Sequence, residues 1–296
     1  MTASLELLRR KAGEWGMEGL VDSAKAAVAH VRALAVGESI GGSMRVTMHF
    51  HPDSPYRGRS TLSAIADRGA YLSQFETNTG NGGLTAFAGG DRWRWESRMF
   101  GGVYDARPAS DRPKYGSLDR HCDGYGGSPR FGSSYFVLAE RTLERTTFCF
   151  PDSVHEPQLF GTAETSSHLL EAAAVTEFDD PLDHYIEAHV HGPINIECDV
   201  EALVLDPSYR GTRFEDVART MPCAVLWHDG YRLAIEQVET HPEYRGNAVV
   251  EVARSVARQG WITPYSLGPA RVSVDPQDLK KVWHYVARYG RRASAW

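Results

Sequence analysis

The sequence predicts an α+β fold, because helical patterns at both ends of the chain enclose a middle region of strand patterns. Apolar residues recur at helical spacing over residues 4–36 and again in several stretches after residue 211. A chain of 296 residues, of which 42% are apolar, is long enough for one core domain with helical additions. We therefore predict an N-terminal helical segment over 1–43, a core over 44–210 and a C-terminal helical region over 211–296.

The individual elements follow from local patterns. The N-terminal helical pattern is interrupted at Gly19 and ends at Gly37, because glycine disfavours the interior of a helix and is common just after its end. Residues 44–52 alternate apolar and polar side chains with period two, which predicts a strand with one face of each kind. Further strands are predicted over residues 71–76, 92–100, 131–138, 145–150, 185–191 and 199–205. Further helices are predicted over residues 164–175, 214–221, 249–258 and 278–289.

Charge and cysteine content exclude several classes of protein. The net charge of −6 and the scattered basic residues give no reason to expect nucleic-acid binding. No stretch approaches the ~20 apolar residues of a membrane helix, and the N-terminus lacks the layout of a secretory signal. The four cysteines show no CxxC spacing, so neither a zinc knot nor a disulfide framework is expected. We expect a cytoplasmic protein, or one delivered into a host cell by a specialised secretion system.

Two histidines share one face of the first predicted strand, and an aspartate follows that strand. The segment is His49-Phe50-His51-Pro52-Asp53. Such an HxH pair can bind a divalent metal ion, present hydrogen-bonding groups to the ribose of a nucleotide, or be held structurally in a polar interior. The sequence leaves these three interpretations open.

A glutamate lies within a second strand that also carries two histidines. Glu187, His189 and His191 share the face opposite to the apolar one. Acidic residues are depleted from strands and are costly to bury unless paired, so this placement indicates a functional site. The alternative is a glutamate on the solvent side of an edge strand. A metallohydrolase built on the two HxH strands is a further alternative, although the other histidines form no ligand motif.

Glycine-rich segments provide further candidates. Residues 71–83 run from a polar strand into a loop of Thr, Asn and Gly, which can expose backbone N–H groups to a ligand or can form a long hairpin turn. This loop is neither a P-loop nor a dinucleotide-binding GxGxxG. Residues 112–118 and 127–138 contain Tyr115 and Phe131, which can face a ligand or lie in the core.

Taken in order, eight segments resemble those of the CteC-like bacterial ADP-ribosyltransferases, a family that modifies threonine on ubiquitin. The segments are HFHPD, YLSQFETNTGNGG, RWRWESRMFGGVYD, RPKYGSL, GSPRFGSSYFVL, RTTFCFPDS, YIEAHVHGPI and DVEALVLDPSYR, and they fall roughly within residues 44–210. Each segment is short, but eight in the same order are specific. The resemblance implies an ADP-ribosyltransferase-like fold, with two small β-sheets around a cleft for NAD, and the role of a bacterial effector or toxin.

The resemblance also implies a catalytic pair made of an aspartate and a glutamate. By position the glutamate is Glu187, and the aspartate is Asp53, with Asp105 as the second choice. Tyr115 or Phe131 is expected to pack against the nicotinamide ring, and no metal is expected. The residues implied to bind NAD are His51, Gln74, Phe75, Thr77, Asn78, Gly82, Tyr115, Phe131 and Ser133. The sequence departs from the family at Leu72, where a basic residue is expected.

We therefore expect a mono-ADP-ribosyltransferase that cleaves NAD at the nicotinamide–ribose bond and transfers ADP-ribose to a protein hydroxyl. The implied acceptor is a threonine of ubiquitin, and no nucleic-acid or membrane partner is expected. The alternatives are an NAD glycohydrolase on the same fold and the metallohydrolase described above. The helical ends either complete the core or dock the protein target.

Overall fold

A computed structural model of the chain describes residues 17–39, 44–79 and 85–291. The α-helices are α2 (Asp22–Leu34), α3 (Thr61–Arg68), α4 (Gln74–Thr77), α6 (Asp91–Met99), α7 (Ser167–Val175), α8 (Ile196–Asp199), α9 (Arg213–Arg219), α10 (Ile235–Glu239), α11 (Asn247–Val256), α12 (Pro264–Leu267) and α13 (Pro276–Tyr289). The predicted α+β class is confirmed. None of these helices is long and apolar enough to cross a membrane.

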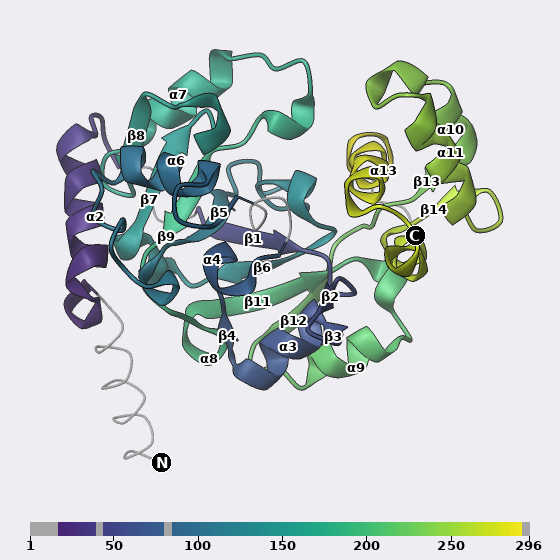
Figure 1. Cartoon of the computed structure of the whole chain (residues 1–296), viewed down its shortest axis with the longest axis horizontal. Helices are drawn as coiled ribbons and strands as arrows, with labels where there is room; N and C mark the ends of the chain where they lie inside the picture. The colour runs from purple at the N-terminus through teal and green to yellow at the C-terminus, as the bar shows by residue number, and fades with distance from the viewer. Residues whose placement is uncertain (1–16, 40–43, 80–84, 292–296) are drawn as a thin grey trace.

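A mixed sheet of eight strands forms the centre of the molecule (Figure 1). Its strands, from one edge to the other, are β12 (Ala224–Trp227), β11 (Val200–Leu205), β6 (Ser134–Leu138), β1 (Val46–Phe50), β5 (Lys114–Leu118), β9 (Glu187–Val190), β7 (Thr146–Phe150) and β8 (Leu159–Thr162). Neighbouring strands are antiparallel except β11 and β12, which are parallel. Three two-stranded sheets pair β2 (Pro55–Tyr56) with β3 (Arg59–Ser60), β4 (Ala70–Tyr71) with β10 (Ile194–Asn195), and β13 (Leu233–Ala234) with β14 (Trp261–Ile262).

One face of the large sheet is apolar and packs against helices. Val46, Met48 and Phe50 of β1 point into this core, as their alternation predicts. Helices α3, α7 and α9 supply the facing side chains, among them Leu62 and Leu169. Burial of these apolar side chains is the main driving force for the core, at about 25 cal/mol per Å².

The opposite face of the sheet carries polar side chains. Register places Thr47, Ser117, Glu187 and Cys149 in one row across β1, β5, β9 and β7. Helices α2 and α6 contribute to an apolar cluster that covers the β7 end of this face and includes Cys149. At the β1 end, the backbone N–H of Gly127 donates to the Thr47 hydroxyl at 2.9 Å.

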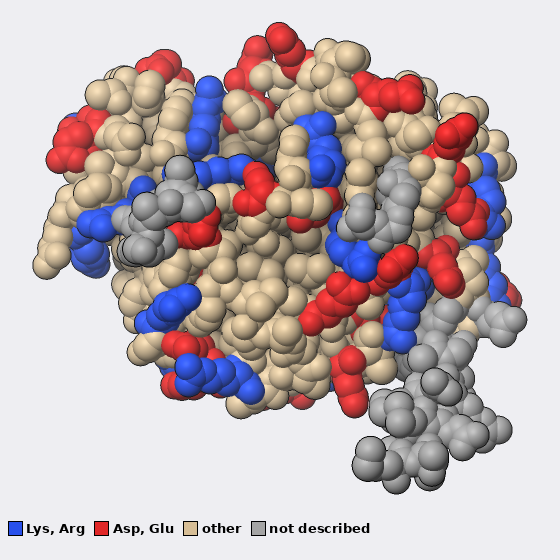
Figure 2. All heavy atoms as spheres, turned by 180° about the vertical axis from the view of Figure 1, so that it is seen from behind, with Lys and Arg blue, Asp and Glu red and all other residues tan. Residues whose placement is uncertain are grey.

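The C-terminal region has a core of its own. Helices α10, α11 and α13 lie together at the side of the sheet away from α2 (Figure 1). Their buried apolar side chains form a second cluster, which also includes Tyr125 from the middle of the chain. The indole of Trp283 in α13 donates to the carbonyl of Pro129 at 2.9 Å, joining this region to the core. On the face shown in Figure 2, Lys and Arg alternate with Asp and Glu and form no continuous basic patch, in line with the net charge of −6.

Two predicted strands are helices instead. Residues 71–76 form only the last residue of β4 and the start of α4, because Ser73 and Glu76 make a capping box around the first turn. Residues 92–99 fall in α6 and Phe100 is its C-cap; the buried side chains of the helix are Arg92, Glu96 and Met99. These three residues have helical spacing, but two of them are charged. A pattern of apolar residues therefore does not reveal the buried face of this helix.

The sheet arrangement also differs from the prediction. One sheet of eight strands takes the place of the two small sheets expected from the resemblance. Strand β12 belongs to the central sheet, although residues 211–296 are predicted to form a C-terminal helical region. The first strand, the strands β7, β9 and β11, and helices α7, α9, α11 and α13 lie where the sequence predicts them. Of the N-terminal helix over 4–36, residues 22–34 are confirmed as α2, and residues 4–16 lie outside the described residues.

Candidate functional site

Glu187 is a buried carboxylate on the polar face of the sheet. It begins β9 and is only 5% exposed. Its Oε1 lies 2.8 Å from Nε2 of His189, and its Oε2 accepts a hydrogen bond from the Ser153 hydroxyl at 3.2 Å. Both carboxylate oxygens are therefore held in place. The alternative of a glutamate on the solvent side of an edge strand is wrong, because Glu187 is buried.

The surroundings of Glu187 favour its ionised form. Burial alone raises the pKa of a carboxyl group, but the contacts with His189 and Ser153 and the nearby Arg92 guanidinium outweigh burial and lower the pKa of Glu187 below its ordinary 4.5. The site therefore presents a fixed negative charge away from bulk water.

A chain of hydrogen-bonding groups continues from His189 into the protein. Nδ1 of His189 lies 3.3 Å from the Thr147 hydroxyl, which lies 3.0 Å from Nε2 of His191. Nδ1 of His191 lies 2.7 Å from the hydroxyl of Tyr104. An ionised Glu187 only accepts hydrogen bonds, so with His189 neutral every donor in the chain points toward the carboxylate. Burial lowers the pKa of His191 well below 6.5, which keeps that ring neutral.

Arg92 and Tyr115 lie beside this carboxylate. The Arg92 guanidinium lies 4.1 Å from the centre of the Tyr115 ring, and that ring packs edge-on against His189 at 5.1 Å. The Tyr115 hydroxyl donates to Glu96 at 3.1 Å, and Glu96 also pairs with the buried Arg112. Nε and Nη1 of Arg92 are buried and find no hydrogen-bond partner in the described part of the chain. Unsatisfied cationic donors at this position are suited to an anionic group of a ligand.

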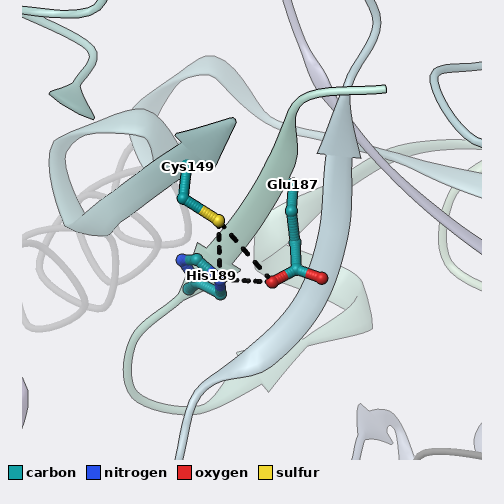
Figure 3. A group of neighbouring side chains, drawn as sticks. All are labelled: Cys149, Glu187 and His189. Atoms are coloured by element: carbon teal, nitrogen blue, oxygen red, sulfur yellow. Dashed lines mark hydrogen bonds and ion pairs between the residues drawn. The ribbon is translucent and has the colours of Figure 1, made fainter. Parts of the chain in front are cut away.

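A cysteine completes the immediate surroundings of Glu187 (Figure 3). Sγ of Cys149 in β7 lies 3.8 Å from Oε1 of Glu187 and 4.0 Å from Nε2 of His189. All three side chains are buried, and their donor atoms are close enough to share a metal ion. The sequence did not single out Cys149, because its partners lie on a different strand.

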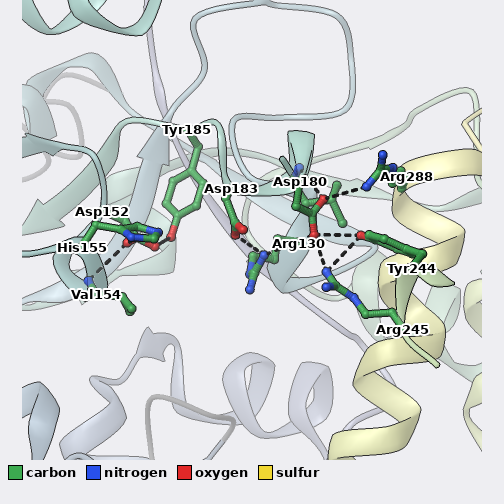
Figure 4. A network of polar contacts seen from close by, with 11 residues as sticks. Arg130, Asp152, Val154, His155, Asp180, Asp183, Tyr185, Tyr244, Arg245 and Arg288 are labelled. Atoms are coloured by element: carbon green, nitrogen blue, oxygen red, sulfur yellow. Dashed lines mark hydrogen bonds and ion pairs between the residues drawn. The ribbon is translucent and has the colours of Figure 1, made fainter. Parts of the chain in front are cut away.

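Asp152 is a second carboxyl group near Glu187 that the sequence analysis missed. It follows β7, and its Oδ2 accepts a hydrogen bond from the Tyr185 hydroxyl (Figure 4). Burial and the negative charge of Glu187 raise the pKa of Asp152. The neighbouring Ser153 bonds Glu187 directly. The segment RTTFCFPDS contains Asp152, so its position after a buried strand was the available signal.

A second group of polar contacts connects the core to the C-terminal helices. Arg130 pairs with Asp183, and Asp180 accepts a hydrogen bond from the Tyr244 hydroxyl at 2.9 Å (Figure 4). Arg245 also binds the Asp180 carboxylate. Charged groups from both regions therefore meet close to Asp152 and Tyr185.

Asp53 lies in a different cluster. The strand register places Glu187 of β9 level with Thr47 of β1, and β1 lies two strands away from β9. Asp53 follows Thr47 by six residues in the chain. At about 4.8 Å between neighbouring strands, the sideways separation alone is about 10 Å. The Asp53 carboxylate pairs with Arg271 at 3.3 Å, and burial raises its pKa. The structure thus places Asp53 against the C-terminal region and not beside Glu187.

Other predicted NAD-binding residues divide between these two places. His51 contacts the Ser133 hydroxyl at 3.3 Å and packs edge-on against Trp283, in the vicinity of Asp53. Phe131 is 45% exposed and packs against Tyr185, closer to Glu187.

The predicted glycine-rich loop begins as helix α4. Phe75 stacks beneath Arg112, and Thr77 donates its hydroxyl to the carbonyl of Ser73. Asn78 ends the helix in the left-handed conformation, with φ of 52°. Gln74 is in the first turn, and Gly82 lies outside the described residues. Asp105, the second choice for the catalytic aspartate, is exposed and accepts a hydrogen bond from Ser97 at 2.9 Å.

The structure does not bring the two HxH pairs together as one ligand set. His49 accepts a hydrogen bond from the backbone N–H of Ser128 and contacts the carbonyl of Gly132 at 3.1 Å, so both ring nitrogens are used by the backbone. His191 contacts Thr147 and Tyr104. Of the four histidines, His189 alone falls in the group of possible metal ligands found among the described residues.

The match to a protein family covers almost all of the described chain. It spans residues 45–181 and 173–289. The chain belongs to the family described as "Protein of unknown function (DUF3626)". The matched segments include the strands that carry Cys149 and Glu187 and also the C-terminal helices, so both regions are part of the family pattern. No curated protein matches the chain.

Proposed function

We propose that this protein is an ADP-ribosyltransferase that cleaves NAD at the nicotinamide–ribose bond, with Glu187 as the catalytic carboxylate. The observation that carries the proposal is the ionised, buried carboxylate of Glu187, held through both oxygens by His189 and Ser153. The resemblance of eight segments to the CteC-like ADP-ribosyltransferases supports the same assignment. A cleft for NAD, which the same resemblance implies, is part of this proposal.

The chemistry of the reaction requires such a group. Departure of nicotinamide develops positive charge on the ribose carbon, and a preorganised negative charge stabilises that transition state. Because the hydrogen bonds to Glu187 are already formed, little reorganisation is needed at the moment of reaction.

The residues around Glu187 fit a dinucleotide. Arg92 has two buried N–H groups without a partner in the described structure, and a phosphate oxygen would satisfy them. The ring of Tyr115 lies against both Arg92 and His189, where an aromatic ligand could pack. Arg92 is therefore assigned to the phosphates, and Tyr115 to the nicotinamide side.

Asp152 is assigned as the second carboxyl group, in place of Asp53. Its raised pKa suits a proton acceptor for the incoming hydroxyl, which is weakly nucleophilic without a base. Asp53 is far from Glu187 and has Arg271 as its ionic partner. The acceptor implied by the resemblance is a threonine of ubiquitin, and water would be the acceptor in a glycohydrolase.

Access to Glu187 requires movement. Two surface pockets, of about 230 and 260 Å³, lie elsewhere: Arg32 and Glu144 are among the residues that line the first, and Asp206 and Trp261 among those that line the second. Glu187 is only 5% exposed. A substrate therefore reaches it when the segments that cover the polar face move aside, and the return of these segments over the bound substrate would exclude water during the reaction.

The test is to incubate the protein with NAD, with and without ubiquitin, and to measure nicotinamide release and the mass of ubiquitin. Release with a mass gain identifies the transferase, and release alone identifies the glycohydrolase. Glu187→Gln is expected to lower release by about 10²-fold or more. The exposed Glu164→Gln is the matched control and is expected to keep full activity. Near-normal release by a folded Glu187→Gln protein would overturn the proposal.

The two aspartates are compared in the same assay. Asp152→Asn is expected to lower transfer to ubiquitin strongly, because the Asn side chain cannot accept the proton of the attacking hydroxyl. Asp53→Asn is expected to act through stability alone, since Asp53 pairs with Arg271. A larger loss of transfer in a folded Asp53→Asn protein would return the role to Asp53.

A further inference from the structure

We propose that Cys149, Glu187 and His189 form a binding site for a Zn²⁺ ion, and that the bound ion blocks the carboxylate required for NAD cleavage. The first part stands on the geometry of the three side chains. The second part rests on the function proposed above, since it concerns the regulation of that same site.

The donor atoms are spaced as a metal ion requires. Sγ of Cys149, Oε1 of Glu187 and Nε2 of His189 form a triangle with sides of 2.8, 3.8 and 4.0 Å. The circle through these three atoms has a radius of about 2.1 Å, which matches Zn–N, Zn–O and Zn–S bonds of about 2.0–2.3 Å. An ion at or near the centre therefore reaches all three atoms with shifts of a few tenths of an ångström.

The rigidity of the site supports the same conclusion. The three residues lie opposite or next to one another on β7 and β9, where Cys149 pairs directly with Glu187 across the two strands. Each side chain is buried, so no rotamer freedom in solvent is lost on binding. Thiolate, carboxylate and imidazole are the ligands that Zn²⁺ takes most often, and three protein ligands leave one position open.

The protons balance without another reactant. The buried Cys149 thiol loses its proton to solvent when sulfur binds the metal. Nε2 of His189 must also be free, which the ring achieves by carrying its proton on Nδ1. That N–H then faces the Thr147 hydroxyl at 3.3 Å, the kind of partner that orients a metal-bound histidine. Binding of one Zn²⁺ thus releases one proton, from Cys149.

A bound ion would interfere directly with the proposed reaction. It takes Oε1 of Glu187, the same oxygen that His189 contacts in the structure. It also neutralises the negative charge that stabilises the ribose carbon. Zn²⁺ is therefore expected to inhibit, and Cys149 is the one member of the triad that the proposed NAD reaction does not use.

The binding test uses the full-length protein and Co²⁺, which replaces Zn²⁺ and gives a thiolate-to-cobalt absorption band. The band is expected with one Co²⁺ per chain and is expected to disappear when Zn²⁺ is added. Cys149→Ser and Cys149→Ala should each abolish the thiolate-to-cobalt band, because each removes the sulfur atom of the triad. Cys223→Ser is the matched control and should keep the band, because Cys223 lies outside the triad. Circular dichroism establishes that each variant is folded.

A second arm measures nicotinamide release. Zn²⁺ should lower the rate of the wild type, and the rate of Cys149→Ser should stay at its own metal-free value. Absence of the band in the folded wild type, or its persistence in both Cys149 variants, would overturn the site. The proposed inhibition would be overturned if Zn²⁺ left the rate of NAD cleavage unchanged, or if cleavage required Zn²⁺. A band without any NAD cleavage would support the metal site and reject the function proposed above.

Discussion

The hydrogen-bonded chain behind Glu187 gives a prediction that can be tested without any substrate. Tyr104 is fully buried, and its hydroxyl lies 2.7 Å from Nδ1 of His191. Burial raises the pKa of Tyr104, so the phenol stays protonated and donates to the neutral imidazole. Tyr104→Phe removes this donor and keeps the ring that packs on Phe100.

The expected cost follows from what is left behind. Nδ1 of His191 becomes an acceptor without a donor in a side chain that is fully buried. A buried polar group that loses its partner costs about 1–3 kcal/mol, more than the net value of the hydrogen bond itself. We therefore expect Tyr104→Phe to lower the free energy of unfolding by about 1–3 kcal/mol.

Urea unfolding followed by tryptophan fluorescence measures this difference. Tyr231→Phe is the matched control: Tyr231 is 3% exposed, and its hydroxyl finds no hydrogen-bond partner within the described residues. Its removal should leave the free energy of unfolding unchanged or raise it. Equal losses in the two variants, or no loss in Tyr104→Phe, would show that the Tyr104–His191 hydrogen bond does not stabilise the fold.

Two further predictions concern buried charge. Asp199→Asn should lower the free energy of unfolding by about 3–5 kcal/mol, because Arg145, which lies 3.2 Å away and is 2% exposed, loses its buried partner. The surface variant Asp91→Asn should lower it by less than about 1 kcal/mol. Similar losses in the two variants would contradict this account. Burial lowers the pKa of His49 from 6.5 to about 3, so stability is lost as pH falls from about 6.5 toward 3, at up to about 1.4 kcal/mol per pH unit. Unfolding measured between about pH 6.5 and 4.5 should show a shallower slope for His49→Gln, whose amide can still reach Gly132, and an unchanged slope would assign the acid sensitivity to other groups.

Helix α6 shows why part of the fold could not be predicted. Its sequence alternates Arg and Trp, which favours a strand when apolar side chains are assumed to point inward. In the structure Arg92 and Glu96 are buried instead, since Arg112 and Tyr115 from other parts of the chain provide their partners. Burial of charge depends on partners that are distant in sequence, and local periodicity carries no information about them.

The sequence predicted Glu187 of the candidate site but not the groups around it, because those groups are also distant in sequence. Glu187 stood out because a carboxylate in mid-strand must be paired or exposed. Its neighbours Cys149 and Ser153 were not identified, because the pairing of β7 with β9 brings them close across 34 residues or more. Asp53 was the predicted aspartate, with Asp105 as the second choice, because it follows the first strand, but the strand order places that strand two positions away from β9.

By itself, the sequence determined the α+β class, the buried and polar faces of the strands around Phe50 and Glu187, and the positions of the long amphipathic helices. These features depend on the period of apolar residues along a single segment, which is a local property. The tertiary structure alone decided the single eight-stranded sheet, the burial of Arg92 and Glu96, and which groups surround Glu187. These features depend on strand order and on pairs of distant charges, because the free energy of a buried polar group is set by the partner it meets after folding.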